Sequence, residues 1–325
     1  MRMRTPCAII LSLLLSFTAW GKTSRIKNIG ESPNFLALSP DGRTAYVTSY
    51  GTSEVLAVDI AQKTVTKSVV VGTAPLGIAV SSDGKLAIIA CKDSGTVSFL
   101  NLDTFRVEAD INTGGAPNAV AIDPKGYRAF VTNFGRTKEG NLHILDIRQR
   151  SVEASMVMGM APIAVAVSPV SELVYVVNGG SNEVWVVNPE RKVVTSKIPV
   201  GEAPDGIAVT PDGNRIFVSN SRSNDVSVID AQLGKVVVTI PVGKSPFGIA
   251  VSPDGKRVFV VNTESRSVSI LPADLTTLQA QSFEVEKGPV DIEVAPDNRT
   301  VLVVNEQSHS LTVADVPLQA AGSKE

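Results

Sequence analysis

Short runs of β-branched and aromatic residues, each about five to eight residues long, follow one another along nearly the whole chain. The runs are rich in Val and Ile, and several of them are apolar on both faces instead of alternating strictly between apolar and polar residues. Gly, Asp, Asn and Pro separate the runs, and none shows the spacing of an amphipathic helix. The pattern predicts an all-β protein whose strands are buried on both sides.

A repeat of 42 to 45 residues organises these strands. Each copy begins at a proline and contains four strands, a to d, with a Pro-Asp-Gly turn between strands a and b in several copies. A period of this length, built from short strands, is typical of a β-propeller. The sequence therefore predicts a seven-bladed β-propeller of four-stranded antiparallel blades. The seven prolines are Pro33, Pro75, Pro117, Pro162, Pro204, Pro246 and Pro289.

The last copy supplies only strands a, b and c, and the residues after it have no strand character. Near the start of the chain, residues 24–29 (SRIKNI) resemble the d strands of the other copies. Pairing this segment with the last copy would close the ring and remove an open sheet edge. We expect the last blade to be closed by this N-terminal strand.

The first residues follow a different pattern. Arg2 and Arg4 precede an almost wholly apolar stretch over residues 7–19, and small residues follow it. The pattern is typical of a secretory signal peptide over residues 1–21, with a retained N-terminal anchor as the alternative. We expect a periplasmic protein whose mature chain, residues 22–325, is a single propeller domain without a transmembrane segment.

Composition narrows the classes of function. The formal net charge is −2 and the aromatic content is 5%, which argues against a nucleic-acid partner. After the signal peptide, Cys91 stands alone, so we expect a buried thiol and no internal disulfide. The two histidines, His143 and His309, lie in different copies, and no C-x-x-C-H motif is present. No cofactor is predicted, although a divalent cation remains open as an alternative.

The strand motifs AYVTS, AFVTN, FVSN and FVVN, with following strands such as VSVID and the link T-I-P-V-G, resemble the YVTN family of β-propeller repeats. Over residues 24–316 the chain is similar to YncE-like periplasmic seven-bladed propellers. The resemblance implies architecture and compartment far more strongly than it implies an activity. Two a–b turns depart from the pattern, at residues 168–171 (SPVS) and 295–298 (APDN).

The connectivity of a propeller places the d–a and b–c loops at one end of the ring. Their residues vary from copy to copy, so we expect a ligand at this end, over the central channel. On the inner strand of the last copy, Asp291 and Glu293 share one face. They are candidates for a cation site or for an acid–base pair with shifted pKa values. The alternative is a pair that faces channel water or is neutralised by a basic residue.

Three polar residues directly follow their repeat prolines at the same end of the ring. Asn34, Asn118 and Asp205 are candidate ligand contacts, or they cap local turns.

The b–c loop of the third copy carries three extra residues and is expected to stand above the others. In it, Phe134 and Arg136 are a candidate contact for a partner or an anionic ligand, with tolerated loop variation as the alternative. Arg222, Arg266 and His309 lie in later b–c loops and could extend a polar rim around the mouth.

Two functions fit these features. The first is an exported binding or scaffold protein of the cell envelope, which presents one propeller face to a protein, a polymer or a small ligand. The alternative is a cation-assisted hydrolase or lyase of the lactonase type, with Asp291 and Glu293 at the channel mouth. No catalytic residue is assigned, so catalysis stays open, with binding favoured. A monomer is expected.

Overall fold

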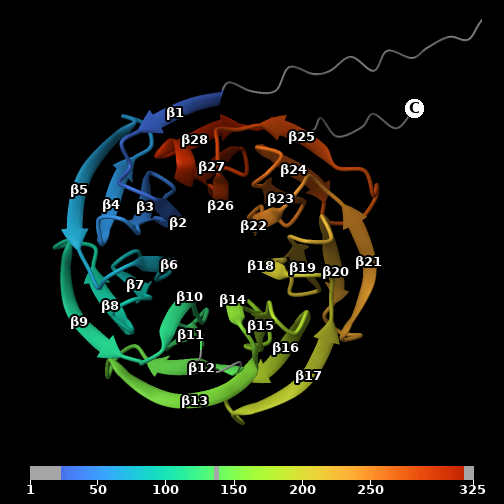
Figure 1. The fold of residues 1–325 in the computed structure, drawn as a ribbon, viewed down its shortest axis with the longest axis horizontal. Coiled ribbons are helices and arrows are strands. Elements are labelled where there is room, and N and C mark those ends of the chain that lie inside the picture. The colour runs from blue at the N-terminus through green and yellow to red at the C-terminus, as the bar shows by residue number, and fades with distance from the viewer. Residues whose placement is uncertain (1–22, 135–138, 318–325) are drawn as a thin grey trace, which may run out of the picture.

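The protein forms a closed ring of seven four-stranded antiparallel sheets (Figure 1). The computed structural model describes residues 23–134 and 139–317. Within these residues the only helix is the single 3-10 turn η1 (Glu306–Ser308). The all-β, seven-bladed prediction is therefore confirmed. The predicted signal peptide, residues 1–21, lies outside the described residues, and the division into leader and mature domain stays a prediction.

Each blade is numbered by the order of its innermost strand, strand a, and strand b pairs beside it. The a strands are β2 (Pro33–Leu38), β6 (Pro75–Val80), β10 (Ala116–Ile122), β14 (Pro162–Val167), β18 (Pro204–Val209), β22 (Pro246–Val251) and β26 (Pro289–Val294). The b strands are β3 (Thr44–Ser49), β7 (Leu86–Cys91), β11 (Arg128–Phe134), β15 (Val174–Asn178), β19 (Arg215–Asn220), β23 (Arg257–Asn262) and β27 (Thr300–Asn305).

Strands c and d complete each blade toward the outside of the ring (Figure 1). The c strands are β4 (Glu54–Asp59), β8 (Thr96–Asn101), β12 (Glu139–Asp146), β16 (Glu183–Asn188), β20 (Asp225–Asp230), β24 (Ser267–Pro272) and β28 (Ser310–Asp315). The d strands are β5 (Thr64–Val70), β9 (Arg106–Asn112), β13 (Ser151–Met160), β17 (Val193–Pro199), β21 (Lys235–Pro241), β25 (Gln281–Glu284) and, for blade 7, β1 (Thr23–Lys27).

The N-terminal strand closes blade 7, as the sequence predicted. Strand β1 pairs with β28, so the sheet runs β1-β28-β27-β26. Ile26 lies opposite Leu311 and is buried, and Ile29, just after the strand, is fully buried. Arg25 of β1 also forms an ion pair at 2.8 Å with Glu286, which follows β25 of the neighbouring blade. The two chain ends are thus joined by the same strand pairing that holds every other blade together.

The core lies in the seams between neighbouring blades. Among the described residues there are seven buried clusters, and each draws its side chains mainly from two adjacent blades. At the seam of blades 6 and 7, for example, Phe259 packs with Ile292, and at the closing seam Ile26 and Leu302 pack with Leu36. This packing explains why the strands are apolar on both faces: each sheet is covered by apolar side chains on both sides.

The inner strands approach one another closely around the axis. A Cβ placed on Gly206 of β18 would stand 2.4 Å from the carbonyl oxygen of Phe247, and one on Gly248 would stand 2.8 Å from the Cα of Asp291. Glycine is needed at these positions because a side chain would push neighbouring backbones apart. The small residues near the start of the a strands therefore allow seven strands to surround a narrow channel.

The a–b turns lie at the opposite end of the ring from the d–a and b–c loops. In the first turn, Ser39 Oγ donates to Asp41 Oδ1 at 2.6 Å, and Gly42 takes a φ of 68°. Asp41 Oδ1 also accepts from the backbone N–H of Arg43 at 3.1 Å. The equivalent turns of blades 2, 5 and 6 repeat the Ser/Thr-to-Asp bond. In these four blades the Ser or Thr and Asp side chains stabilise the turns themselves.

Candidate functional site

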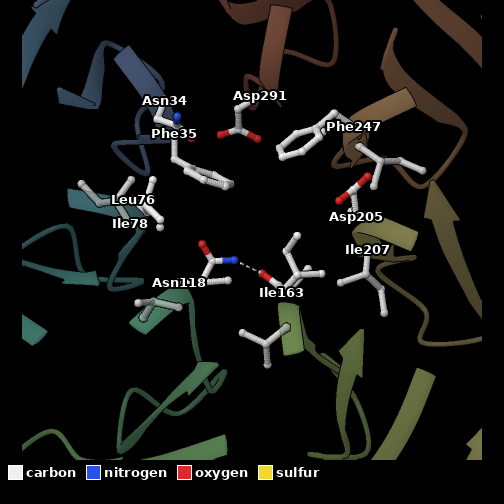
Figure 2. A pocket seen from close by; sticks show the side chains of 18 of the residues that line it. Asn34, Phe35, Leu76, Ile78, Asn118, Ile163, Asp205, Ile207, Phe247 and Asp291 are labelled. Atoms are coloured by element: carbon white, nitrogen blue, oxygen red, sulfur yellow. Dashed lines mark hydrogen bonds between the residues drawn. The ribbon is translucent and has the colours of Figure 1, made fainter. Parts of the chain in front are cut away.

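A cavity of about 370 Å³ opens around the axis at the d–a and b–c end, where the sequence placed the ligand (Figure 2). All seven inner strands contribute to its wall. This volume is at the lower end of the range for small-molecule sites. A second cavity of about 330 Å³ follows the channel toward the a–b turns and shares Glu293, Ile78 and Val120 with the first.

The side chains at the inner ends of the blades change in chemistry around the ring, among amide, aliphatic, acidic and aromatic groups. The residues at the first position after each proline are Asn34, Leu76, Asn118, Ile163, Asp205, Phe247 and Val290. At the second position, most blades have Gly or Ala, whereas blade 1 has Phe35 and blade 7 has Asp291. The fold thus repeats the backbone while the side chains around the axis vary, which is the arrangement expected of a binding surface on a rigid scaffold.

Asp291 joins the last blade to the first. Its Oδ2 accepts a hydrogen bond from the backbone N–H of Leu36 at 2.9 Å, across the closing seam. Its Oδ1 lies over Gly248 of blade 6, where an added Cβ would come within 3.1 Å. Burial of the carboxyl group raises the pKa of Asp291 to about 7, although the N–H groups of Leu36 and Ile292 oppose the shift.

Glu293 lies two residues further along β26, inside the channel and between the two cavities. Burial, followed by the negative charge of Asp291, raises the pKa of Glu293 to about 8. Among the described residues, neither carboxylate takes part in an ion pair. Within the described ranges, the two acids have no basic partner, and they do not converge with a third metal-binding side chain.

The polar residues after the prolines also face this cavity. Asn118 is nearly buried, and its Nδ2 donates to the carbonyl oxygen of Ile163 at 2.7 Å, which links blades 3 and 4 (Figure 2). Burial raises the pKa of Asp205, and a hydrogen bond from Ser221 opposes that shift. Asn34 lines the cavity beside Phe35. The structure thus brings Asn34, Asn118 and Asp205 to one cavity, together with Asp291 and Glu293.

The structure places Phe134 at the end of a strand and not in the third b–c loop, where the sequence analysis put it. Phe134 is the last residue of β11, pairs with Ala116 of β10, is half-buried and lines the cavity. The strand pairing extends one residue further than the sequence suggested, and Phe134 is among the residues that line the cavity. Arg136 lies outside the described residues, so its role as a contact stays a prediction.

The three rim candidates do not line the cavity. Arg222, Arg266 and His309 are exposed in their b–c loops. His309 takes a left-handed backbone conformation, and its Nδ1 accepts a long hydrogen bond of 3.4 Å from the N–H of Ser32. These three side chains are not among those that line the cavity.

Other chemically notable residues belong to the sheets. His143 is buried between Asn133 and Ser155, with ring-nitrogen contacts of 3.1 Å and 2.7 Å, and burial lowers its pKa. Cys91 is fully buried at the position where other blades have Asn, and burial raises its pKa to about 11, as expected for an unreactive thiol. In a typical blade, Asn262 donates to Ser269 Oγ at 2.9 Å and so ties strand b to strand c.

Sequence reasoning missed the apolar part of the site. Phe35, Leu76, Ile163 and Phe247 all line the cavity, yet the candidates chosen from the sequence after the prolines were all polar. The signal was present, because each of these residues stands one or two positions after a repeat proline. An apolar residue at such a position cannot be distinguished from core without the direction of its side chain.

Comparison with known proteins agrees with this geometry. A family described as "YNCE-like beta-propeller" matches residues 145–262, from the end of β12 to the end of β23. The match lies within a ring of seven like blades whose motifs extend along the chain. The chain is a seven-bladed β-propeller that contains a YncE-like segment. The YncE-like fold supports a generic binding or scaffold role.

Solved structures show how widely this YncE-like architecture is shared. In all, 1664 solved chains match, so the fold by itself does not select one activity. One of them, Kuenenia stuttgartiensis hydrazine synthase, has a TM-score of 0.81 at 21% identity, over 89% of this chain and 96% of that chain. At this identity the likeness shows the fold alone. A search of curated proteins gave no match. Among the described residues, no helix is long and apolar enough to cross a membrane.

Proposed function

We propose that this YncE-like propeller is an exported binding protein of the cell envelope that takes a ligand into the channel mouth at the d–a and b–c end. The ligand is a small molecule or a projecting group of a protein or polymer partner. One observation carries the proposal: all seven inner strands line one cavity of about 370 Å³, whose wall combines apolar side chains with converging amide and carboxyl groups. That combination is typical of ligand sites in rigid scaffolds.

The binding role is tested by a ligand screen and by a substitution that fills the mouth with a larger side chain. A thermal-shift screen of residues 22–325 against metals, lactones, sugars, amines and oligonucleotides would identify ligands that stabilise the protein. We expect Ile163→Trp, which fills the mouth, to abolish the shift produced by these ligands. Val170→Trp is the matched control, because Val170 is exposed in the a–b turn of the same blade, at the other end. Equal shifts in both variants would refute binding at the mouth.

Export is a separate part of the proposal and needs its own experiment. The apolar stretch after Arg2 and Arg4 supports a signal peptide over residues 1–21. Expression of the full chain in a bacterial host, followed by periplasmic fractionation and intact-mass measurement, should yield a soluble periplasmic protein cleaved near residue 21. A full-length protein retained with the membrane fraction would favour the uncleaved anchor.

The alternative activity, a cation-assisted hydrolase or lyase, is favoured by one observation. The pKa values of Asp291 and Glu293, raised to about 7 and about 8, suit general acid–base chemistry near neutral pH. However, within residues 23–134 and 139–317 no three potential ligands gather as a metal site. Lactone hydrolysis measured with and without calcium, in wild type and Glu293→Gln, would test it. A rate equal to that of the buffer blank would remove the alternative.

A further inference from the structure

Four consecutive inner strands present acids and aromatic rings alternately to the cavity. Around the mouth, Asp205 of blade 5 is followed by Phe247 of blade 6, Asp291 of blade 7 and Phe35 of blade 1 (Figure 2). In this view each carboxylate lies beside Phe247, and Asp291 lies between the two rings. The sequence separates these residues by more than forty positions each. Packing of neighbouring blades brings the first three together, and closure of the ring adds Phe35. We call these four residues the acid–aromatic arc.

The arc carries negative charge without a cationic partner. Asp291 accepts only backbone N–H groups, and Asp205 is offset by the hydroxyl of Ser221. Within residues 23–134 and 139–317, no Lys, Arg or His lines the cavity. Glu293 adds a third carboxyl group deeper in the channel. Enclosed carboxylates are normally paired, because removing them from water is costly. A bound cation would supply the missing partner.

The opposite half of the mouth is apolar. Leu76 and Ile163 face the cavity there, and the amide of Asn118 is already committed to the carbonyl oxygen of Ile163. This wall offers contact area to a hydrocarbon group and little to a hydrated ion. The cavity therefore combines a charged, aromatic half with an aliphatic half.

These features distinguish between kinds of ligand. An anion would meet three carboxyl groups and, in the part of the chain that the structure describes, no basic side chain. A divalent metal ion prefers six or more oxygen ligands, whereas rings form much of this wall. An ammonium group, in contrast, is stabilised both by carboxylates and by aromatic rings within about 6 Å. Resting on the binding role proposed above, we infer that the mouth binds an alkylammonium group, with its charge at the acid–aromatic arc and its hydrocarbon part against Leu76 and Ile163.

Binding of the cation is coupled to loss of protons. In the free protein, the pKa values of Asp291 and Glu293 are near 7 and 8, so both groups are partly protonated at neutral pH. An ammonium group favours their charged forms, so its affinity rises between about pH 6 and pH 8.5 while the amine itself stays protonated. Of the strands packed against β26, the strands β2, β22 and β27 carry no titratable side chain, and β23 carries only Arg257.

Other charged groups near β26 point elsewhere. Arg257 of β23 donates to the carbonyl oxygens of Asn298 and Pro317 at the a–b end, and Glu306 of η1 lies in the b–c loop. Across the cavity, Asp205 also titrates, and its pKa is raised by burial. Deprotonation of each of the three acids strengthens binding of an ammonium group. The affinity is therefore expected to rise with pH.

The test is calorimetric titration of residues 22–325 with n-butylammonium at pH 8.5, beside n-butanol, butyrate and calcium. We expect butylammonium alone to bind, with about tenfold weaker affinity at pH 6. Asp291→Asn, which keeps an acceptor for Leu36, should weaken binding about tenfold, and Phe247→Leu about threefold. Asp93→Asn, an exposed acid in a b–c loop at the same end, is the matched control and should change nothing.

A second arm identifies the source of the ammonium group. Titration with Nα-acetyl-lysine methylamide, compared with n-butylammonium, shows whether the site prefers a lysine side chain of a polypeptide or a free amine. Binding of either that depends on Asp291 supports the inference.

Three outcomes would overturn the ammonium assignment. The first is equal affinity for butanol and butylammonium, and the second is a higher affinity for calcium than for butylammonium. The third is an affinity for butylammonium that Asp291→Asn does not change. If a neutral or anionic ligand then binds and is lost in Ile163→Trp, the proposed binding role stands and only the ammonium inference falls. If no ligand depends on Ile163→Trp, both fall. Circular dichroism of each variant confirms that it is folded before titration.

Discussion

The two ends of the ring are built from the same strands but use their residues differently. At the a–b end, the same Ser/Thr-to-Asp hydrogen bond recurs in blades 1, 2, 5 and 6, so the side chains there serve the turns. At the mouth, the residue after the proline differs from blade to blade, and acids stand beside rings without basic partners. Repetition thus marks residues that support the fold, whereas variation at a fixed backbone position marks residues available for a ligand.

The largest effect is expected from deletion of the closing strand, because both ends of the ring depend on a closed circle of blades. Deleting residues 22–29 opens blade 7 and exposes the partners of Ile26 and Ile29, both buried. We expect the melting temperature to fall by about 10 °C or more, because two core side chains and a strand pairing are lost. Differential scanning calorimetry measures the change. Ile26→Ala should lower the free energy of unfolding by about 2–5 kcal/mol, and its exposed neighbour Lys27→Ala should not. Unchanged melting of the deletion would show that the ring closes differently.

The next largest effect is a pH dependence of stability that arises from the two acids at the mouth. The folded-state pKa values of Asp291 and Glu293 lie above those of an unfolded chain, so their neutral forms favour folding. That stability is fully present below about pH 4 and is lost as the pH rises through about 7 and 8. Neutralising both, in Asp291→Asn with Glu293→Gln, should raise stability at pH 8.5 by roughly 1–3 kcal/mol and change it little at pH 4.

Thermal denaturation from pH 4 to pH 8.5 measures that difference. Asp93→Asn serves again as the control for removal of one exposed charge at the same end. A double variant with the same pH profile as wild type would show that neither acid is enclosed in solution.

A smaller effect is expected at the a–b end. Asp212 accepts hydrogen bonds from Thr210 Oγ1, the N–H of Asn214 and Asn214 Nδ2. Asp212→Ala should lower the free energy of unfolding by about 1 kcal/mol, since these bonds are near the surface, and should leave ligand affinity unchanged. Urea denaturation and calorimetric titration measure the two quantities. Loss of affinity without loss of stability would contradict the division between the two ends.

The smallest effect concerns the rim. Arg222 and Arg266 are exposed and do not line the cavity. Arg222→Ala and Arg266→Ala should each change the free energy of unfolding by less than about 0.5 kcal/mol and the amine affinity by less than about twofold. Chemical denaturation and titration check both values. A large rise in amine affinity in either variant would show that the rim extends the electrostatic influence of the site.

Much of the fold was predictable because each blade is specified by motifs close together in the sequence, and these motifs are repeated. The proline spacing and the strand motifs indicated seven blades, and the SRIKNI segment indicated the closing strand that β1 provides. The site was only partly predictable. Asp291 and Glu293 stood out because they replace small residues of the repeat, and both line the cavity. Phe134 was placed in a loop, although the pairing of β11 with β10 turns it inward.

The sequence by itself determined the number of blades, their strands and the end at which residues vary, because these properties depend on neighbours along the chain and recur seven times. The tertiary structure alone decided which side chains share the mouth. Phe35 and Phe247 read as ordinary apolar residues until ring closure set them beside Asp291, and Asp291 finds the N–H of Leu36 only because the last blade meets the first. Contacts between residues of separate blades depend on how many sheets complete the circle. No local sequence pattern determines which side chains meet at the mouth.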